Sequence, residues 1–253
     1  MNRDDTVPLL GGVSHAKRVP GRYCAALALD PSSRSRLTPQ QAARFVGDGL
    51  FERVARALCA AGKLPRKELD EAWAVARKVR RRLGGAGGRV VDLCAGHGLL
   101  GQLLLLLDRA ATAAVCVDAA VPPSAALVAG VLAEAFPAEL GAGRVTRVEA
   151  AGADFELGPG DLVVALHACG ELTDLVLARA AAARARVAVL PCCHDLGSGN
   201  QGGLEGWIED GPLAVDLTRA AWLRGQGYQV WTARIDAAVT PKNRLLMGAW
   251  GHV

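Results

Sequence analysis

Apolar positions in the first third of the chain recur at helical spacing. Residues 38–41 read Thr-Pro-Gln-Gln, which places Thr at the N-cap, Pro at the first helical position and Gln at the third. This start predicts a helix over residues 38–60, which Gly62 ends. A second helix is predicted over residues 65–83, because its apolar residues share one face: Leu69, Trp73, Ala76, Val79 and Leu83.

Beyond Gly88, short β-branched runs alternate with stretches rich in Ala and Leu. Such alternation is typical of a parallel α/β sheet. The pattern predicts strands over residues 89–94, 113–118, 144–149, 161–167 and 187–191. Helices are predicted over residues 99–109, 124–136, 172–183 and 213–224.

Two further strands follow, over residues 228–235 and 244–250. The segment between them is too short for a crossover helix, so this pair must be antiparallel. We therefore predict an α/β fold, a Rossmann-like sheet of seven strands that is parallel except for a C-terminal antiparallel hairpin. An irregular arm over residues 1–36 and a helical extension over residues 37–85 precede this domain, which spans residues 86–253.

The composition limits the class of protein without naming a partner. Hydrophobic residues make up 51% of the chain, enough for a sizeable core, and the formal net charge of +4 allows an acidic partner such as RNA. The seven cysteines show no disulfide spacing, which favours reduced thiols. No apolar run reaches the roughly 20 residues that span a bilayer, and the N-terminal sequence MNRDD is unlike a secretory signal. We expect a cytoplasmic protein.

The sharpest motif runs from Val90 to Gly101, VVDLCAGHGLLG, where an apolar strand leads through a glycine turn into a helix. Gly96 and Gly98 allow the backbone to come close to a ligand, and the helix N-terminus offers free N–H groups. Such a turn after the first strand is typical of a nucleotide site. A turn that only packs the helix on the strand would leave Asp92 unexplained.

Two ligands compete for this loop. GHGLLG fits the dinucleotide fingerprint, which would indicate NAD and an oxidoreductase. Asp92, however, would repel a pyrophosphate and suits the cationic amino-acid end of S-adenosylmethionine. Asp118 closes the second strand and can accept hydrogen bonds from ribose hydroxyls. Asp154 follows the third strand, where a carboxylate can accept the adenine amino group, with Phe155 as a wall. Three carboxylates at successive strand ends favour the methyl donor.

The segment from Asp92 to Gly98 resembles motif I of the class I S-adenosylmethionine-dependent methyltransferases, with Cys94 where the first glycine often lies. Three more segments are similar to one branch of that family, which contains the eukaryotic tRNA 2′-O-methyltransferase of the acceptor stem. They are ALHACGELTD over residues 165–174, PCCH over residues 191–194 and TPKNR over residues 240–244. The likeness covers residues 88–250, and the sequence holds no Cys/His zinc module like those of the tRNA enzyme.

This resemblance implies the methyltransferase version of the seven-stranded sheet, with S-adenosyl-L-methionine as the cofactor. The residues expected to hold that donor are Asp92, Cys94, Ala95, Gly96, His97, Gly98, Asp118, Asp154, Phe155 and His167.

His167 ends the fourth predicted strand, beside the expected position of the methyl group. It can serve as the base for a hydroxyl or nitrogen acceptor, or it can only hydrogen-bond to structure around the donor. Cys192, Cys193 and His194 follow the fifth strand and are expected to border the transfer site. Together with Cys169 and His167 they offer zinc ligands, but without the paired short spacings of a zinc module, so we predict no metal.

Several basic residues could contact phosphates if the acceptor is RNA: Arg77, Lys78, Arg80, Arg81, Arg82, Lys242 and Arg244. Such runs are more often solvated surfaces, and the 4% aromatic content offers few stacking platforms. RNA, tRNA included, is the acceptor we favour slightly. The alternatives are a small-molecule methyltransferase, with the helical extension as cover of the acceptor site, and a non-catalytic module that binds S-adenosylmethionine.

Overall fold

The computed structural model describes residues 35–141, 143–197 and 199–251. At its centre is a seven-stranded sheet with the strand order β3-β2-β1-β4-β5-β7-β6. The strands are β1 (Val90–Leu93), β2 (Ala114–Asp118), β3 (Val145–Glu149), β4 (Leu162–Leu166), β5 (Arg186–Leu190), β6 (Tyr228–Arg234) and β7 (Arg244–Trp250). The predicted α/β fold class is confirmed, and each predicted strand is present.

The pairing of the strands brings the carboxyl ends of all strands except β7 to one edge of the sheet. β1 pairs in parallel with β2 and β4, β2 with β3, and β4 with β5. β7 is antiparallel to both β5 and β6, which confirms the C-terminal hairpin. The strand order reverses direction at β1, and in such sheets ligands bind in the crevice at that point, beyond the carboxyl ends. We call this edge the carboxyl edge and the opposite one the amino edge.

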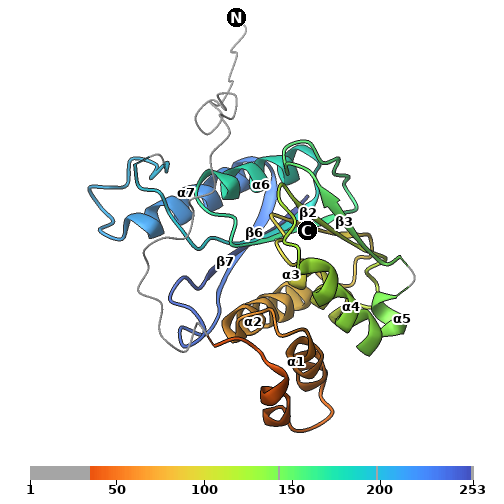
Figure 1. Cartoon of the computed structure of the whole chain (residues 1–253). Coiled ribbons are helices and arrows are strands. Elements are labelled where there is room, and N and C mark those ends of the chain that lie inside the picture. The colour runs from red at the N-terminus through yellow and green to blue at the C-terminus, as the bar shows by residue number, and fades with distance from the viewer. Residues whose placement is uncertain (1–34, 142, 198, 252–253) are drawn as a thin grey trace, which may run out of the picture.

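Helices cover both faces of the sheet (Figure 1). α6 (Glu171–Ala182) and α7 (Gly211–Gly225) pack on one face, and α2 (Arg66–Leu83), α3 (Leu99–Leu107) and α4 (Ala125–Ala135) pack on the other. α1 (Leu50–Ala61) packs against α4, which the short α5 (Pro137–Leu140) follows. Within the described residues, no helix is both long and apolar enough to cross a membrane.

Helix α2 shares its core with the sheet. Its apolar stripe is buried, and it forms one hydrophobic cluster with α3 and with Val164 of β4 and Ala188 of β5. The helix runs toward the start of β1, so its C-terminal turn lies at the amino edge. Its first turns consequently lie at the carboxyl edge, where they contact the loop after β1. This orientation decides which α2 side chains can take part in a site.

The prediction of one helix over residues 38–60 is wrong. Thr38 does cap a helix with Pro39 at its first position, but this is a short 3-10 helix, η2 (Pro39–Arg44), and α1 begins at Leu50. Gly47 between them has a φ of +106°, which no helix accommodates. Arg56 of α1 donates hydrogen bonds to the carbonyl oxygens that the break frees, at 2.7 Å and 2.6 Å. Of the predicted arm, all but residues 35 and 36 lies outside the described residues.

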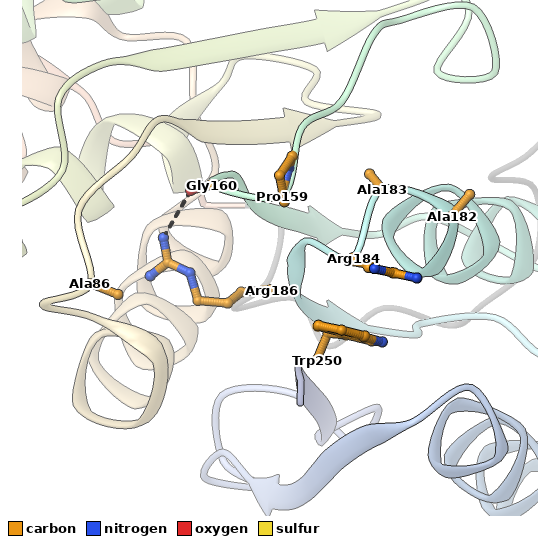
Figure 2. A pocket seen from close by; sticks show the side chains of 8 residues that line it. All are labelled: Ala86, Pro159, Gly160, Ala182, Ala183, Arg184, Arg186 and Trp250. Atoms are coloured by element: carbon orange, nitrogen blue, oxygen red, sulfur yellow. Dashed lines mark hydrogen bonds between the residues drawn. The ribbon is translucent and has the colours of Figure 1, made fainter. Parts of the chain in front are cut away.

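An arginine holds the amino edge together (Figure 2). Arg186, at the start of β5, donates to the carbonyl oxygens of Leu83, Gly87 and Gly160 at 2.6 Å, 2.5 Å and 3.2 Å. A cavity of about 480 Å³ opens beside it, with the Arg184 guanidinium 4.4 Å above the ring of Trp250. Because it lies at the amino edge, this cavity is far from the loop after β1.

The close approach of two loops at this edge makes a prediction for Gly88. An added Cβ there would lie 2.0 Å from the carbonyl oxygen of Gly160, and its φ is +83°. We expect Gly88→Ala to lower the free energy of unfolding by about 3 kcal/mol or more, since backbone strain adds to overpacking. Urea denaturation measures the loss. Gly85→Ala is the matched control, because φ there is +86° but nothing lies within 4 Å. An equal loss of unfolding free energy in the two variants would contradict the predicted clash of the added Cβ with Gly160.

Candidate functional site

The glycine loop, residues 94–98, joins β1 to α3 in left-handed backbone. The φ values of Cys94, Gly96 and Gly98 are +58°, +51° and +67°. Gly98 caps α3, and a Cβ at this position would lie 2.5 Å from the Sγ of Cys116 on β2. Glycine is therefore needed for α3 to begin this close to the sheet. The loop brings the N-terminus of α3, the positive end of the helix dipole, to the carboxyl edge.

Asp92 lies beneath the glycine loop and is only 1% exposed. Its Oδ2 accepts a hydrogen bond from the N–H of Gly101 at 2.9 Å, which ties β1 to the first turn of α3. Burial raises the pKa of this carboxyl to about 7, although the bond from Gly101 opposes the shift. Asp92 thus supports the loop from below, as a carboxyl group with little access to water.

Asp118, at the end of β2, holds the loop from the side. Its Oδ2 accepts from the N–H of Gly96 at 2.8 Å, and its Oδ1 accepts from the N–H of Ala120 at 3.0 Å. Asp154 is exposed on the loop after β3, and the half-buried Phe155 lies 5.4 Å from the guanidinium of Arg89. Of the three carboxylates named from the sequence, Asp92 and Asp118 thus contact the glycine loop and its helix, and Asp154 does not.

Helix α2 contributes a carboxylate to the glycine loop. Glu68 places its Oε1 3.4 Å from the Nδ1 of His97. The other ring nitrogen of His97, Nε2, lies 2.9 Å from the Oγ of Ser124, the N-cap residue of α4. His97 therefore joins the helical extension, the loop and α4 through one imidazole.

A second carboxylate of α2 reaches the end of β4. Glu71 is 2% exposed, and its Oε2 lies 3.0 Å from the Nε2 of His167. Burial lowers the pKa of His167, but the hydrogen bond and the charge of Glu71 outweigh burial, so the pKa is raised overall. Burial likewise raises the pKa of Glu71, but the hydrogen bond and charge of His167, the hydrogen bond of Thr240 and the charge of Lys67 together outweigh burial, so that pKa is lowered. Both shifts describe one ion pair at the carboxyl edge.

His167 itself has a strained backbone, with a φ of +68°. A non-glycine residue in the left-handed region costs on the order of 1 kcal/mol and persists only where its surroundings fix it. Its side chain is 40% exposed while one ring nitrogen is held by Glu71. An imidazole that is fixed by a carboxylate at one nitrogen and open elsewhere has the arrangement of a general base.

Three thiols meet next to this histidine. The Sγ of Cys169 lies 2.8 Å from that of Cys192 and 3.3 Å from the carbonyl oxygen of His167. The Sγ of Cys193 is 3.6 Å from that of Cys192. The hydrogen bond from Cys192 lowers the pKa of Cys169 to about 6, and the same contact raises the pKa of Cys192. Cys192 and Cys193 were predicted from the sequence to border the transfer site, and in the structure Cys169 lies beside them.

His194 is paired with an acid of α7. Its side chain is 2% exposed, and its Nε2 lies 2.7 Å from the Oδ1 of Asp216 on α7. Asp216 also accepts a 2.6 Å bond from Arg244, and these charges outweigh burial to lower the pKa of Asp216. His194 therefore belongs to a polar network between α7 and β7.

The basic residues proposed for RNA contact lie in two places. Arg244 is held by Asp216 and by Asp210, at 2.6 Å and 3.2 Å. The run from Arg77 to Arg82 lies in the last turns of α2, toward the amino edge, where Arg80 donates to the carbonyl of Leu107 and Arg82 lies 4.7 Å above the ring of Trp231. Neither set contributes a free cation next to the glycine loop. Lys242 is half-buried and lines a cavity of about 190 Å³ with His194.

Sequence reasoning missed Glu68 and Glu71. The signal that could have found them is their spacing, since residues three apart share a helix face. Glu71 stands between the apolar positions Leu69 and Ala72 on the buried side of α2, and an acid on such a face needs a partner. The identity of that partner, His167, depends on how α2 packs on the sheet, which no local pattern contains.

Comparison with known proteins identifies a family to which the chain is similar. The family profile described as a methyltransferase domain matches residues 67–198. No curated protein matches the chain.

Solved structures with a similar fold share little sequence with this chain. An O-methyltransferase family protein from Burkholderia thailandensis is 20% identical over 83% of this chain and 63% of its own, with a TM-score of 0.47. This chain thus spans less than two thirds of that protein. A ribosomal protein L11 methylase from Lactobacillus delbrueckii is 14% identical over 76% and 82% of the two chains, with a TM-score of 0.46. The magnesium protoporphyrin IX methyltransferase from Synechocystis, solved with bound S-adenosylhomocysteine, is 15% identical over 84% and 94%, with a TM-score of 0.44.

The buried carboxyl of Asp92 predicts a pH dependence of stability. Its pKa of about 7 in the folded protein exceeds the ordinary aspartate value of 3.8, so the folded state binds the proton more tightly than the unfolded state. The stability it contributes is complete below about pH 4 and is lost as the pH rises through about 7. Asp92→Asn removes this titration and keeps an oxygen to accept from Gly101.

We therefore expect the stability of Asp92→Asn, relative to the ligand-free wild type, to rise between pH 4 and pH 7. The slope should be at most on the order of 1 kcal/mol per pH unit. Denaturation at a series of pH values measures it, with Asp154→Asn as control because that side chain is exposed. Parallel curves for wild type and Asp92→Asn would contradict the prediction.

Proposed function

The chain belongs to the family of methyltransferase domains, whose profile covers residues 67–198, and we propose that it transfers a methyl group to a ribose hydroxyl of RNA. S-adenosylmethionine is the methyl donor of this enzyme. The observation that carries the proposal is the 3.0 Å contact between the buried carboxylate of Glu71 and the partly exposed imidazole of His167. A carboxylate that holds an imidazole supports an acceptor that must lose a proton, such as a hydroxyl.

The glycine loop is the proposed donor site. Backbone from Cys94 to Gly98 would lie against the donor, with Asp118 placed for the ribose hydroxyls and Asp154 with Phe155 for the adenine. Asp92 and His97 would hold the loop from below and from α2, given their bonds to Gly101 and Glu68. In this proposal Asp92 acts on the donor mainly through its negative charge, since its side chain is buried.

His167 is the proposed base. Its Nε2 faces Glu71, which leaves Nδ1 to accept the proton of the acceptor hydroxyl while the oxygen attacks the methyl carbon of the sulfonium. The C–S bond breaks as the C–O bond forms, and the electron pair leaves with the sulfur. Glu71 is a positioning residue that fixes the ring and stabilises its cationic form after proton transfer. Cys192 and Cys193 would border the acceptor.

RNA is the acceptor that the surface near the carboxyl edge favours. The cavity at the ends of β5 and β7 has a volume of about 190 Å³, below the roughly 300 Å³ at which pockets enclose small ligands. The loop after β5 carries Trp207, which is 90% exposed, and an exposed aromatic ring is a platform on which a base can stack. The net charge of +4 and the resemblance to the acceptor-stem 2′-O-methyltransferase branch support the same acceptor.

The base assignment predicts a loss of rate without a loss of donor binding. His167→Ala is expected to lower kcat by about 100- to 10,000-fold. Glu71→Gln is expected to lower it by at least about 10-fold, because it acts only through the histidine. Single-turnover rates and calorimetry with S-adenosylmethionine separate the two effects. Asp70→Asn, on the same helix but paired with Arg66, is the control. A His167→Ala enzyme with wild-type kcat would exclude this base.

The acceptor assignment predicts where a labelled methyl group goes. With tritiated S-adenosylmethionine, total RNA should take up label that alkaline digestion recovers in alkali-resistant dinucleotides, because a 2′-O-methyl group blocks cleavage of the following phosphodiester bond. Trp207→Ala should raise KM for RNA severalfold at unchanged donor affinity, because stacking contributes about 1–3 kcal/mol per base. Label that enters a small-metabolite extract and no RNA would exclude RNA and favour the small-molecule alternative.

A further inference from the structure

The loops after β4 and β5 place three cysteine thiols at one point of the carboxyl edge. The Sγ atoms of Cys169, Cys192 and Cys193 all lie within 4.8 Å of one another. They come from two parts of the chain that adjacent parallel strands bring together, since β4 pairs with β5 along its whole length. We propose that these three cysteines bind a soft divalent cation, zinc, an inference that goes beyond the proposed function and does not depend on it.

The backbone holds the two loops in this arrangement. The N–H of Gly170 donates to the carbonyl oxygen of Cys193 at 3.1 Å, next to the thiol cluster. Thr173 of α6 donates from its hydroxyl to the carbonyl of Ala168, which fixes the residue before Cys169. Hydrogen-bonded turns at the ends of two strands thus hold the thiols in place. This order reduces the loss of conformational entropy when a metal binds.

The distances suit thiolate ligands of zinc. With Zn–S bonds of about 2.3 Å, the edge of a tetrahedron is about 3.8 Å. Cys192 and Cys193 are at 3.6 Å, and the 2.8 Å between Cys169 and Cys192 has to open by about 1 Å, within the reach of side-chain rotation. That separation is also well above the roughly 2.05 Å of a disulfide, so Cys169 and Cys192 are not joined by one.

Three thiolates leave one position of a tetrahedral zinc ion for another ligand. His194 does not supply it with its Nε2, which is held by Asp216 at 2.7 Å, and the Nε2 of His167 is held by Glu71 at 3.0 Å. Among the described residues, the group of ligand atoms that meets at this spacing consists of the three sulfurs alone. Water would complete the shell, and a site with three protein ligands and an exchangeable fourth is of the open kind.

The test is the zinc content of the full chain. Protein purified with added zinc and then desalted should retain one zinc ion per chain by mass spectrometry of the metals. Cys169→Ser, Cys192→Ser and Cys193→Ser should each lose it. Cys59→Ala is the matched control, a buried thiol of α1 outside the cluster, and should keep its zinc. Calorimetric binding of S-adenosylmethionine checks that the variants remain folded.

A second measurement needs no variant. Alkylation of the wild-type protein followed by peptide mapping should show Cys169, Cys192 and Cys193 protected by zinc and labelled after a chelator removes it. Substitution with cobalt should give the sulfur-to-metal charge-transfer absorption of a thiolate site.

Three results would overturn the proposal. They are wild-type protein that retains no zinc, zinc that stays bound in all three serine variants, and equal alkylation of the three thiols with and without zinc. A disulfide between Cys169 and Cys192 in zinc-treated protein would overturn it as well, and would indicate a redox pair instead.

Discussion

The ion pair between Glu71 and His167 is the contact on which the arrangement of the site depends. A carboxylate that is 2% exposed cannot remain charged beside an apolar cluster unless a partner compensates for its lost hydration. That partner stands at the end of β4, so the pair fixes the rotation and the height of α2 on the sheet. Removing the imidazole would leave the buried carboxylate of Glu71 to depend on Lys67, whose Nζ is 3.6 Å from its Oε1. Helix α2 is consequently a wall of the site, and its position cannot change without breaking this pair.

The same rotation of α2 determines what the glycine loop contacts. Glu68 lies one turn before Glu71 on the same face, and it meets His97 as Glu71 meets His167. One helix therefore touches both the loop expected to hold the donor and the residue expected to take the acceptor's proton. The family profile covers residues 67–198, so it includes these two acids together with the first five strands. The core describes the same unit, because the apolar face of α2 packs with β4 and β5.

Most of the fold could be predicted from the sequence, because its signals are local. Strand runs such as the one around Val164, the turn at Gly88 and the hairpin at the end depend on residues that are neighbours in the chain. The break at Gly47 could not, since Arg56 compensates for it from the next helix. The site shows the same division. The glycine loop is a continuous motif, whereas the partner of Glu71 and the pairing of His194 with Asp216 depend on packing between distant segments.

The sequence does not reveal whether an arginine is available to bind an external phosphate. Arg80 and Arg244 are both candidates for phosphate contact in the sequence. In the structure, however, Arg80 donates to the carbonyl oxygen of Leu107, and two carboxylates hold Arg244. A guanidinium loses its capacity for an external anion when its donors are used inside the protein. The acids at the carboxyl edge are different in this respect, because several of them converge there: Glu68, Glu71, Asp92 and Asp118.

This concentration of acids explains the choice of ligand more fully than Asp92 alone. A pyrophosphate placed at the N-terminus of α3 would have the helix dipole in its favour and these carboxylates against it. A sulfonium donor with a cationic amino group would instead be attracted by these carboxylates. Its charge would also ease the burial of Asp92, whose pKa of about 7 reflects the absence of a nearby cation strong enough to offset burial. Donor binding and ionisation of Asp92 should therefore favour each other. At neutral pH the buried carboxylate of Asp92 lowers the stability of the ligand-free protein, and the same charge contributes to the affinity for a cationic donor.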